Sequence, residues 1–327
     1  MPRKPEDLER VTDAIRASDE WLIVTHERPD GDAIGSALAM ACILQSLKKS
    51  WVLALSEPMP SRFRFLPLSE NAVIVDSGYH RKFDRVIAVD CADTKRFEPV
   101  AFCIGDDPVM VNIDHHQTNP GFGVAALVDE TAAATCELIF HIAKSLDVAI
   151  TRDLATCLYT GILTDTAGFV QPNTTRSVHL ITAELLASGV RPYDVAEPAL
   201  ESRTWEQMHL LQMALANLAV SADGQYAALY VTRGMLEGAG ATDDDVEGLV
   251  SFARSIDTVE VGLLFRETQD GKVKVSLRSK RRVDVSQIAQ QFGGGGHVRA
   301  AGCVIDADLN RAMDVVVERV EKALCSA

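Results

Sequence analysis

The sequence predicts an α/β protein with two domains: an N-terminal doubly wound, mostly parallel sheet and a smaller C-terminal α+β domain, with a cleft between them. Three observations support this prediction. The chain of 327 residues is long enough to bury two hydrophobic cores. Its first half alternates short apolar runs with segments of helical apolar spacing, as βα units do. Its second half contains a strand of alternating apolar and polar residues that follows a hairpin signal.

The first half contains short runs rich in Val and Ile that are apolar on both faces. Such runs are typical of parallel strands covered on both sides. The predicted strands span 21–26, 51–55, 72–75, 85–90 and 109–113. The predicted helices span 32–47, 131–146, 151–163 and 175–188. This alternation of strands and helices predicts the doubly wound domain, to which we assign residues 1–190.

Gly189, Pro192 and Pro198 interrupt this alternation, so we predict a linker region over 191–219 and a second domain over 220–327. A mixed helix is predicted at 204–219, within the linker region. The second domain is predicted to contain strands at 225–232, 259–266, 273–277 and 301–305, and helices at 285–292 and 308–324. Gln269-Asp270-Gly271-Lys272 predicts a hairpin turn, and Thr242-Asp243-Asp244-Asp245 predicts the start of a further helix.

The composition limits the classes of function. A chain that is 47% hydrophobic and 24% charged is an ordinary globular protein. The net charge of −14 argues against a broad basic surface for duplex nucleic acid, but one local basic patch is enough for a short anionic ligand. The cysteines form no CxxC pair, no apolar signal segment is visible, and no apolar run is long enough to span a membrane. We therefore expect a cytoplasmic protein without membrane partners.

Histidine and aspartate side chains follow several of the apolar stretches. We predict six metal ligands among them: His26, Asp30, Asp32, Asp90, His115 and Asp165. Taken singly, each is more often a turn or cap residue. Together they bring ligand-type residues to four separate strand or helix ends, which favours a metal site.

The charges of these residues predict the number of cations. Four buried aspartates carry −4, which two divalent ions would neutralise, and the ions would then acidify a water molecule and attract phosphate. Mixed imidazole and carboxylate ligands suit Mn²⁺ best, with Mg²⁺, Co²⁺ or Zn²⁺ as substitutes. The sequence therefore predicts a two-metal site that acts on a phosphate ester.

The same positions resemble the four motifs of the DHH phosphoesterase superfamily. These motifs are His26-x-x-x-Asp30-x-Asp32, Asp90, Asp114-His115-His116 and Asp165. The C-terminal runs Ser276-Leu277-Arg278-Ser279-Lys280, Phe292-Gly293-Gly294-Gly295-Gly296-His297 and Ala300-Ala301-Gly302 are similar to the DHHA1 domain. The resemblance covers nearly the whole chain. Its length and two-domain arrangement are most similar to the bifunctional oligoribonucleases and 3′-phosphoadenosine 5′-phosphate (PAP) phosphatases of this family.

The resemblance implies a role for each motif residue. One cation would be held by His26, Asp30 and Asp90, and the other by Asp32, Asp90, His115 and Asp165, with Asp90 bridging. His116 and Asp114 would be the catalytic residues. His116 would face the substrate as an electrophile or proton donor, and Asp114 would support it from behind.

The resemblance also implies a substrate class: short RNA and PAP, hydrolysed to mononucleotides with manganese. We expect no duplex DNA as a partner, because of the acidic net charge, and we leave the formation of a homodimer open. Hydrolysis of cyclic or linear dinucleotides, c-di-AMP or pApA, is the closest alternative. RecJ-like exonucleases are usually longer, and family II pyrophosphatases lack a Gly-Gly-Gly-Gly-His run. A nucleotide-binding regulator without catalysis is a further alternative, which the complete ligand set disfavours.

The glycine run at 293–296 lies between a predicted helix and a predicted strand, so it is not a free linker. A glycine-rich turn lets backbone N–H groups approach an anion closely. Arg278, Lys280, Arg281, Arg282 and Arg299 form the densest cationic cluster in this acidic chain, although solvent exposure alone explains Arg281 and Arg282. With the resemblance, this cluster predicts a substrate-binding site in the second domain. Its predicted residues are Arg278, Ser279, Gly294, Gly295, Gly296 and His297.

Overall fold

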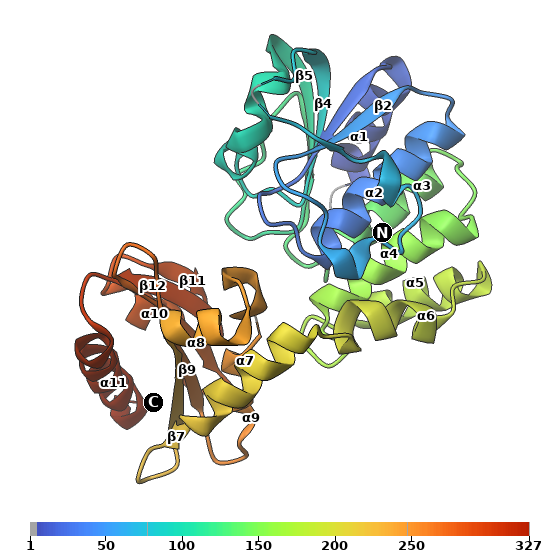
Figure 1. Ribbon diagram of the computed structural model, residues 1–327. Helices are drawn as coiled ribbons and strands as arrows, with labels where there is room; N and C mark the ends of the chain where they lie inside the picture. The colour runs from blue at the N-terminus through green and yellow to red at the C-terminus, as the bar shows by residue number, and fades with distance from the viewer. Residues whose placement is uncertain (1–4, 77, 247, 327) are drawn as a thin grey trace. The chain divides into compact units, whose positions relative to one another are not determined.

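The computed structural model describes residues 5–76, 78–246 and 248–326 of the chain. Contacts divide the chain into two compact units, with the division between Ser202 and Arg203 (Figure 1). This division falls inside the segment 191–219 that the sequence predicts as a linker region. That segment is helical over much of its length, with α6 (Pro192–Ala196), the π-helix η4 (Glu197–Glu201) and α7 (Trp205–Ala216).

The first unit is built on a six-stranded sheet with the strand order β3-β2-β1-β4-β5-β6, in which every pair is parallel. The strands are β1 (Trp21–Val24), β2 (Trp51–Leu55), β3 (Val73–Ile74), β4 (Phe83–Val89), β5 (Ile104–Asp114) and β6 (Ala125–Val128). From β1 the chain adds strands toward one edge of the sheet, through β2 to β3, and from β4 it adds them toward the other edge, through β5 to β6. The strand order therefore reverses between the neighbours β1 and β4. The predicted doubly wound sheet is confirmed.

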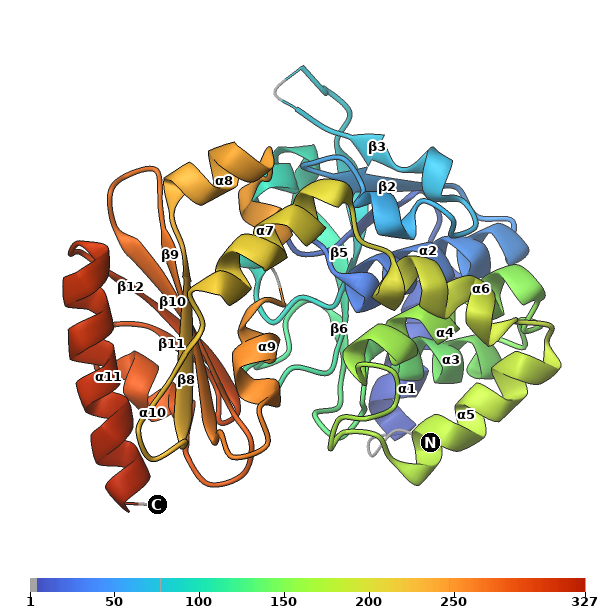
Figure 2. The same ribbon diagram turned by 60° about the horizontal axis from the view of Figure 1, so that its bottom comes forward.

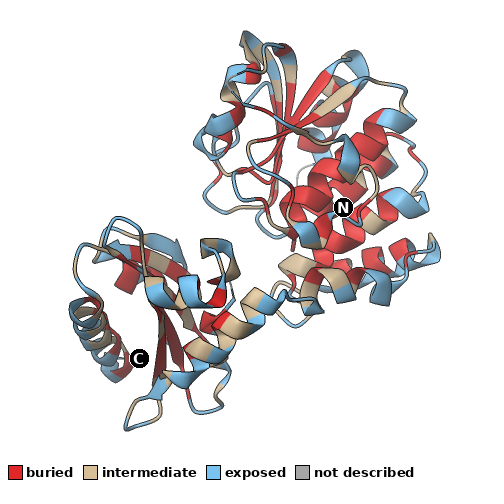
Figure 3. Ribbon diagram, in the orientation of Figure 1, coloured by how far each residue is buried: buried red, intermediate tan, exposed pale blue. Residues whose placement is uncertain are grey.

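Unequal layers cover the two faces of this sheet. One face packs against α1 (Pro5–Ala17), α2 (Gly31–Ser46) and α3 (Thr135–Ser145), and α4 (Arg152–Asp165) and α5 (Arg176–Ala187) pack on these helices. The other face packs mainly against the 3₁₀ segment η3 (Thr94–Cys103), through Phe97, Val100 and Cys103. Helix α2 is buried on nearly all sides between the sheet and α3 and α4, and Figure 3 shows it almost entirely in the colour of buried residues.

Helix α1 and strand β6 of the first unit were not predicted from the sequence. Helix α1 buries Leu8, Val11 and Ile15, which recur at helical spacing within a largely charged segment. Strand β6 has only four residues, and it pairs with the end of β5, where Asp114 lies opposite Val128. The sequence also predicts a first strand over 21–26. The observed strand ends at Val24, which leaves Thr25 and His26 in the following loop.

The second unit is built on a mixed six-stranded sheet with the order β11-β12-β10-β9-β8-β7. Its strands are β7 (Ala219–Val220), β8 (Tyr226–Val231), β9 (Val261–Glu267), β10 (Val273–Ser279), β11 (Gly295–His297) and β12 (Ala300–Ile305). Strands β8 and β9 are parallel, and the other pairs are antiparallel. The predicted hairpin turn joins β9 and β10, with Gly271 at φ 79°.

Helices cover both faces of this second sheet, as Figure 2 shows. On one face, α10 (Val285–Gln290) and α11 (Leu309–Ser326) pack on Leu263, Phe265 and Val275. On the other, α7, α8 (Arg233–Ala239) and α9 (Val250–Ser255) pack on Ala227, Leu229 and Val231. The helix predicted to start at Thr242 is only a 3₁₀ turn over Asp243–Val246, and α9 starts later. Within the described ranges, no helix has the length and apolar character needed to cross a bilayer.

Candidate metal centre

All the predicted metal ligands belong to the first unit and lie beyond the carboxyl ends of its strands or at helix ends. His26 follows β1 and Asp90 follows β4, and these two strands are neighbours at the point where the strand order reverses. In an open parallel sheet, the loops diverge at this point and leave space for a ligand. The sequence placed these residues at strand ends, and the strand order brings them together.

Asp90 lies at the centre of the cluster. Its carboxylate oxygens lie 3.6 Å from His26 Nε2, 3.7 Å from His115 Nε2 and 3.7 Å from His116 Nδ1. The residue is only 2% exposed and has φ 57°, a left-handed conformation that Asp tolerates better than most residues. This backbone turn ends the parallel strand and directs the side chain into the cluster.

Three overlapping groups of donor atoms could each hold a metal ion. Within each group, the ligand atoms lie within 4.8 Å of one another. The groups are His26, Asp30 and Asp90; Asp32, His115 and Asp165; and Asp90, His115 and His116. Asp90 and His115 each belong to two of the groups. His115 Nε2 also lies 3.3 Å from Asp165 Oδ2 and 3.9 Å from Asp32 Oδ2. Every predicted ligand is therefore in the cluster, and the shared members place the candidate donor groups next to one another.

The titration behaviour of the cluster reflects its excess of buried negative charge. Burial and the nearby charge of Asp90 raise the pKa of Asp32 to about 7, and the same two causes raise the pKa of Asp30. Burial and the charges of Asp32 and the other carboxylates raise the pKa of Asp165. Burial alone would lower the pKa of His26 and His115, but nearby carboxylates outweigh it, so both pKa values lie above the ordinary value. These groups bind protons unusually tightly, because the buried negative charge is not balanced by cationic side chains among the described residues of the cluster. A divalent cation would neutralise the same negative charge.

Helix α2 presents two of the ligands from its first turn. The side chain of Asp30 caps the helix by accepting hydrogen bonds of 3.0 Å from the N–H groups of Asp32 and Ala33. Close packing with α4 needs glycine, because a Cβ at Gly31 would lie 2.4 Å from Thr164 Oγ1 and one at Gly161 would lie 2.5 Å from Asp32 Oδ1. The two helices therefore approach closely enough for Asp32 and Asp165 to share His115.

The start of α3 supports the cluster, although the sequence did not indicate this role. The backbone N–H groups of Thr135 and Cys136 donate to the carboxylate of Asp32 at 2.6 and 3.0 Å. The hydroxyl of Thr135 donates to Asp90 Oδ1 at 2.9 Å, and the carbonyl oxygen of Ala132 lies 3.3 Å from His115 Nδ1. Hydrogen bonds of this kind orient metal ligands. The sequence predicts this helix over 131–146, whereas the observed helix begins at Thr135, so the predicted boundary did not indicate that Thr135 lies at the helix start.

Asp114 and His116 form a pair beside the cluster. Asp114 is fully buried, and its Oδ1 lies 2.7 Å from His116 Nδ1. The hydrogen bond and negative charge of Asp114 raise the pKa of His116. The His116 side chain is 28% exposed, so it has access to solvent that Asp114 lacks. This arrangement fits the predicted order of the two residues, with His116 in front and Asp114 behind.

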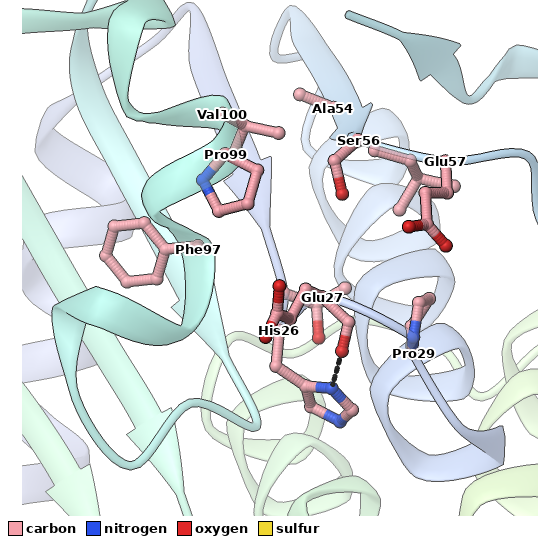
Figure 4. Close-up of a pocket in the computed structure, with 11 residues that line it drawn as sticks. His26, Glu27, Pro29, Ala54, Ser56, Glu57, Phe97, Pro99 and Val100 are labelled. Carbon is pink, nitrogen blue, oxygen red and sulfur yellow. Dashed lines mark hydrogen bonds between the residues drawn. The ribbon is translucent and has the colours of Figure 1, made fainter. Parts of the chain in front are cut away.

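A small pocket, with a volume of about 10 Å³, adjoins the cluster between the ends of β1 and β2 and the segment η3. Phe97, Pro99 and Ser56 line it, and the imidazole of His26 points away from these three side chains (Figure 4). His26 Nδ1 lies 2.8 Å from the carbonyl oxygen of Glu27. This contact occupies Nδ1 and leaves Nε2, which lies near Asp90, to coordinate a cation.

The predicted substrate-binding residues belong to the second unit. Arg278 is near the end of β10, opposite Ala300, and His297 is exposed on β11. Ser279 is 1% exposed, and its hydroxyl donates to the carbonyl oxygen of Val283 at 2.7 Å, so this side chain holds the following loop. A ligand would meet Arg278 and His297 more readily than the hydroxyl of Ser279.

The glycine run is only partly a turn. Gly295, Gly296 and His297 form strand β11, which pairs with β12 at the edge of the sheet. A Cβ at Gly294 would lie 2.2 Å from the carbonyl oxygen of Gly302, and one at Gly296 would lie 2.5 Å from that of Ala300, whereas one at Gly295 would meet no atom within 4 Å. Packing therefore explains Gly294 and Gly296, but not Gly295.

Several of the clustered basic side chains bind the protein itself. Lys280 Nζ donates to the carbonyl oxygens of Ile256 and Asp257, and Arg282 donates to Gln225 Oε1. The Arg299 guanidinium donates to the carbonyl oxygens of Val283 and Arg281. The assignment of Arg282 to a solvated loop was incomplete, because this side chain binds Gln225, which directly precedes β8.

Comparisons with known proteins agree with this fold and site. Residues 20–162 match the DHH family, N-terminal domain, and residues 223–324 match the DHHA1 domain. The chain belongs to the DHH family of phosphoesterases and carries a C-terminal DHHA1 domain.

Individual relatives align over the whole chain. A protein of Thermus thermophilus named bifunctional oligoribonuclease and PAP phosphatase NrnA is 35% identical, over 100% of this chain and 97% of its own. The protein of that name from Bacillus subtilis is 26% identical, over 89% of this chain and 91% of its own. The crystal structure of an exopolyphosphatase-related protein from Bacteroides fragilis has a TM-score of 0.89 and 26% identity, covering 97% and 96% of the two chains.

Proposed function

We propose that this protein is a metal-dependent phosphoesterase that hydrolyses short oligoribonucleotides and PAP to mononucleotides. The observation that carries the proposal is the position of Asp90, which forms a donor group with His26 and Asp30 and also lies 3.7 Å from His115 Nε2, a member of the donor group with Asp32 and Asp165. A shared carboxylate between adjacent cation sites is typical of phosphoester hydrolysis by two metals. The relatives named bifunctional oligoribonuclease and PAP phosphatase supply the substrate class.

Two Mn²⁺ ions are the proposed cofactor. His26, Asp30 and Asp90 would hold one, and Asp32, Asp90, His115 and Asp165 would hold the other. Mixed imidazole and carboxylate donors favour Mn²⁺ over Ca²⁺ and leave Mg²⁺, Co²⁺ and Zn²⁺ as substitutes. When bound, the two ions supply an activated water nucleophile and neutralise charge on the non-bridging phosphate oxygens.

The protein's own residues complete the reaction. His116 donates a proton or a hydrogen bond to the leaving group, and Asp114 keeps its imidazole oriented for that step. In the second domain, to which we assign residues 220–327, Arg278, His297 and the N–H groups of the glycine run bind a terminal phosphate of the substrate. The net charge of −14 disfavours duplex DNA and fits a small anionic substrate held by a few local groups.

A substrate panel tests this proposal. The purified protein with Mn²⁺ would be incubated with pAp, RNA from dimers to long oligomers, pApA, c-di-AMP and pyrophosphate, each with and without a chelator. We expect rapid, chelator-sensitive hydrolysis of pAp and the shortest RNAs, with rates per end that fall as the RNA lengthens. Faster turnover of c-di-AMP or pyrophosphate than of pAp and the shortest RNAs would contradict the substrate assignment. Activity that survives exhaustive chelation would contradict the metal mechanism.

A further inference from the structure

Asn119 lies in the loop after β5, and its side chain connects the ends of β4 and β5. Its Nδ2 lies 2.6 Å from Asp114 Oδ2, 2.9 Å from Asn112 Oδ1 and 3.0 Å from the carbonyl oxygen of Cys91. Three acceptors around one atom require that atom to be the amide nitrogen. The amide oxygen accepts a hydrogen bond of 2.8 Å from the N–H of Gly121. The surroundings of Asn119 therefore fix the orientation of its amide.

Asp114 transmits this constraint to His116. Its Oδ2 accepts from Asn119, and its Oδ1 faces both His116 Nδ1 at 2.7 Å and the backbone N–H of His115 at 2.9 Å. A carboxylate held at both oxygens cannot rotate away from the imidazole. The bond from Nδ1 to Asp114 keeps a proton on Nδ1 in both states of the ring. The imidazolium therefore donates from Nε2, and the neutral ring that remains is the Nδ1–H tautomer.

The same network holds the backbone beside the metal centre. The carbonyl oxygen of Cys91 accepts from Asn119 and also from Asn112 Nδ2, at 3.3 Å. Cys91 directly follows Asp90, whose backbone is left-handed at φ 57°. Two buried amides thus hold the peptide next to the shared carboxylate, so Asn112 retains this contact when Asn119 is replaced. Of the two amides, Asn119 is the one that reaches Asp114.

We propose that Asn119 is a positioning residue, which clamps the Asp114 carboxylate and so keeps a proton on His116 Nδ1 and orients the ring so that Nε2 is the donating atom in catalysis. The kinetic part rests on the proposed function, whereas the tautomer is a property of the protein alone. Asn119→Asp keeps the shape but turns an oxygen toward three acceptors, so it removes every bond that the amide nitrogen donates. Asn119→Ala removes the clamp without adding charge.

The kinetic test compares these variants in two backgrounds. We expect Asn119→Ala and Asn119→Asp to lower kcat on pAp by about 10- to 100-fold, with KM and the Mn²⁺ dissociation constant changed by less than about threefold. In a His116→Ala background, adding Asn119→Ala should lower kcat further by less than about threefold, because both changes act through one imidazole. An equal loss in both backgrounds would overturn the proposal, since it would show a general structural role.

The second test reads the tautomer directly. Nitrogen-15 NMR of the His116 ring in the metal-free, labelled protein, at a pH high enough for the ring to be neutral, should show a proton on Nδ1 in the parent chain and a mixture of tautomers in Asn119→Ala. An unchanged His116 tautomer in folded Asn119→Ala would refute the clamp. Because no substrate is needed, this result stands even if the parent protein hydrolyses no phosphoester, an outcome that would refute only the proposed function.

Asn217 provides a matched control in the second unit. Its amide also bridges backbone groups, donating to the carbonyl oxygen of Tyr230 at 2.9 Å and accepting from the N–H of Tyr230 at 2.9 Å. Asn217→Asp should leave kcat and the His116 signals unchanged, and a similar loss there would contradict the specific role of Asn119. If Asn119→Ala fails to fold, Asn119→Ser carries the same comparison, because its hydroxyl is a single donor with shorter reach.

Discussion

Thr135 Oγ1 donates a hydrogen bond of 2.9 Å to Asp90 Oδ1, and this bond joins the start of α3 to the end of β4. The backbone N–H of the same residue donates to Asp32 Oδ2 at 2.6 Å. One threonine therefore orients a carboxylate from each of two donor groups. Asp90 is in this way connected both to the other candidate ligands and to the helix that lies behind them.

The hydroxyl of Thr135 should be necessary for tight metal binding. Thr135→Val keeps the shape and the backbone donor but removes the bond to Asp90, so we expect Mn²⁺ affinity to fall by about 10- to 100-fold. Thr135→Ser retains the hydroxyl and should bind almost normally. Isothermal titration calorimetry measures both affinities. A valine variant that binds like the serine variant would show that the hydroxyl does not orient Asp90.

Asp90→Asn should disable both cation sites while preserving the fold. Asparagine tolerates the left-handed backbone at this position, whereas alanine would add strain. The amide removes one negative charge and one ligand oxygen, so we expect a loss of activity of at least about 100-fold and weaker binding of both ions. Binding stoichiometry and turnover measure this. Near-normal turnover, or the loss of only one ion, would contradict the shared role of Asp90.

The stabilising effect of metal should increase with pH. Carboxyl groups with raised pKa values, such as Asp32 at about 7, oppose folding once the pH exceeds their unfolded-state values. Histidines with raised pKa values, such as His26 and His115, stabilise the fold at low pH and lose this contribution as the pH rises through the folded-state pKa. Both effects have the same sign.

The metal-free protein should therefore lose stability from about pH 4 to about pH 8, and a cation should restore it. The lowered pKa of Asp90, about 2, acts only below this window. We expect the rise in Tm caused by Mn²⁺ to be larger at about pH 8 than at about pH 6, because protons then compete less with the metal. Differential scanning calorimetry measures this rise, and the opposite trend would refute the assignment of these groups as ligands.

Two glycines of the same run should respond differently to substitution. A Cβ at Gly294 would collide with the backbone of Gly302, so Gly294→Ala should lower the thermal stability of the second unit. A Cβ at Gly295 would meet open space, so Gly295→Ala should fold normally. If a phosphate approaches the backbone there, Gly295→Ala should nevertheless raise KM for pAp several-fold. An unchanged KM would remove Gly295 from the binding site.

Arg278→Ala should separate substrate binding from metal binding. The side chain belongs to the second unit, whereas every candidate metal ligand belongs to the first. We expect KM for pAp to rise about 10- to 100-fold, as for loss of a charge-assisted contact of about 1.5–3 kcal/mol, with the Mn²⁺ affinity unchanged. Arg281→Ala provides an exposed control from the same basic cluster. Equal effects of the two variants would favour a diffuse electrostatic role.

Much of the first unit was predictable because its signals are local. Apolar runs and helical spacing identified α2, α4 and α5 to within about two residues, since burial on a sheet imposes that periodicity. Short β6 escaped detection because its four residues carry no pattern that distinguishes them from a loop. Helix α1 escaped because its apolar residues are spread through charged ones.

The sequence by itself determined which residue types could coordinate cations, and that they follow strands or end helices, because ligand chemistry belongs to single side chains. Only the tertiary structure decided which of them meet. The order of the parallel strands puts β1 beside β4, and α3 supplies donors to Asp32 from 103 residues away. The roles of Thr135 and Asn119, and the burial of Ser279, depend on long-range packing, which leaves no local pattern in the chain.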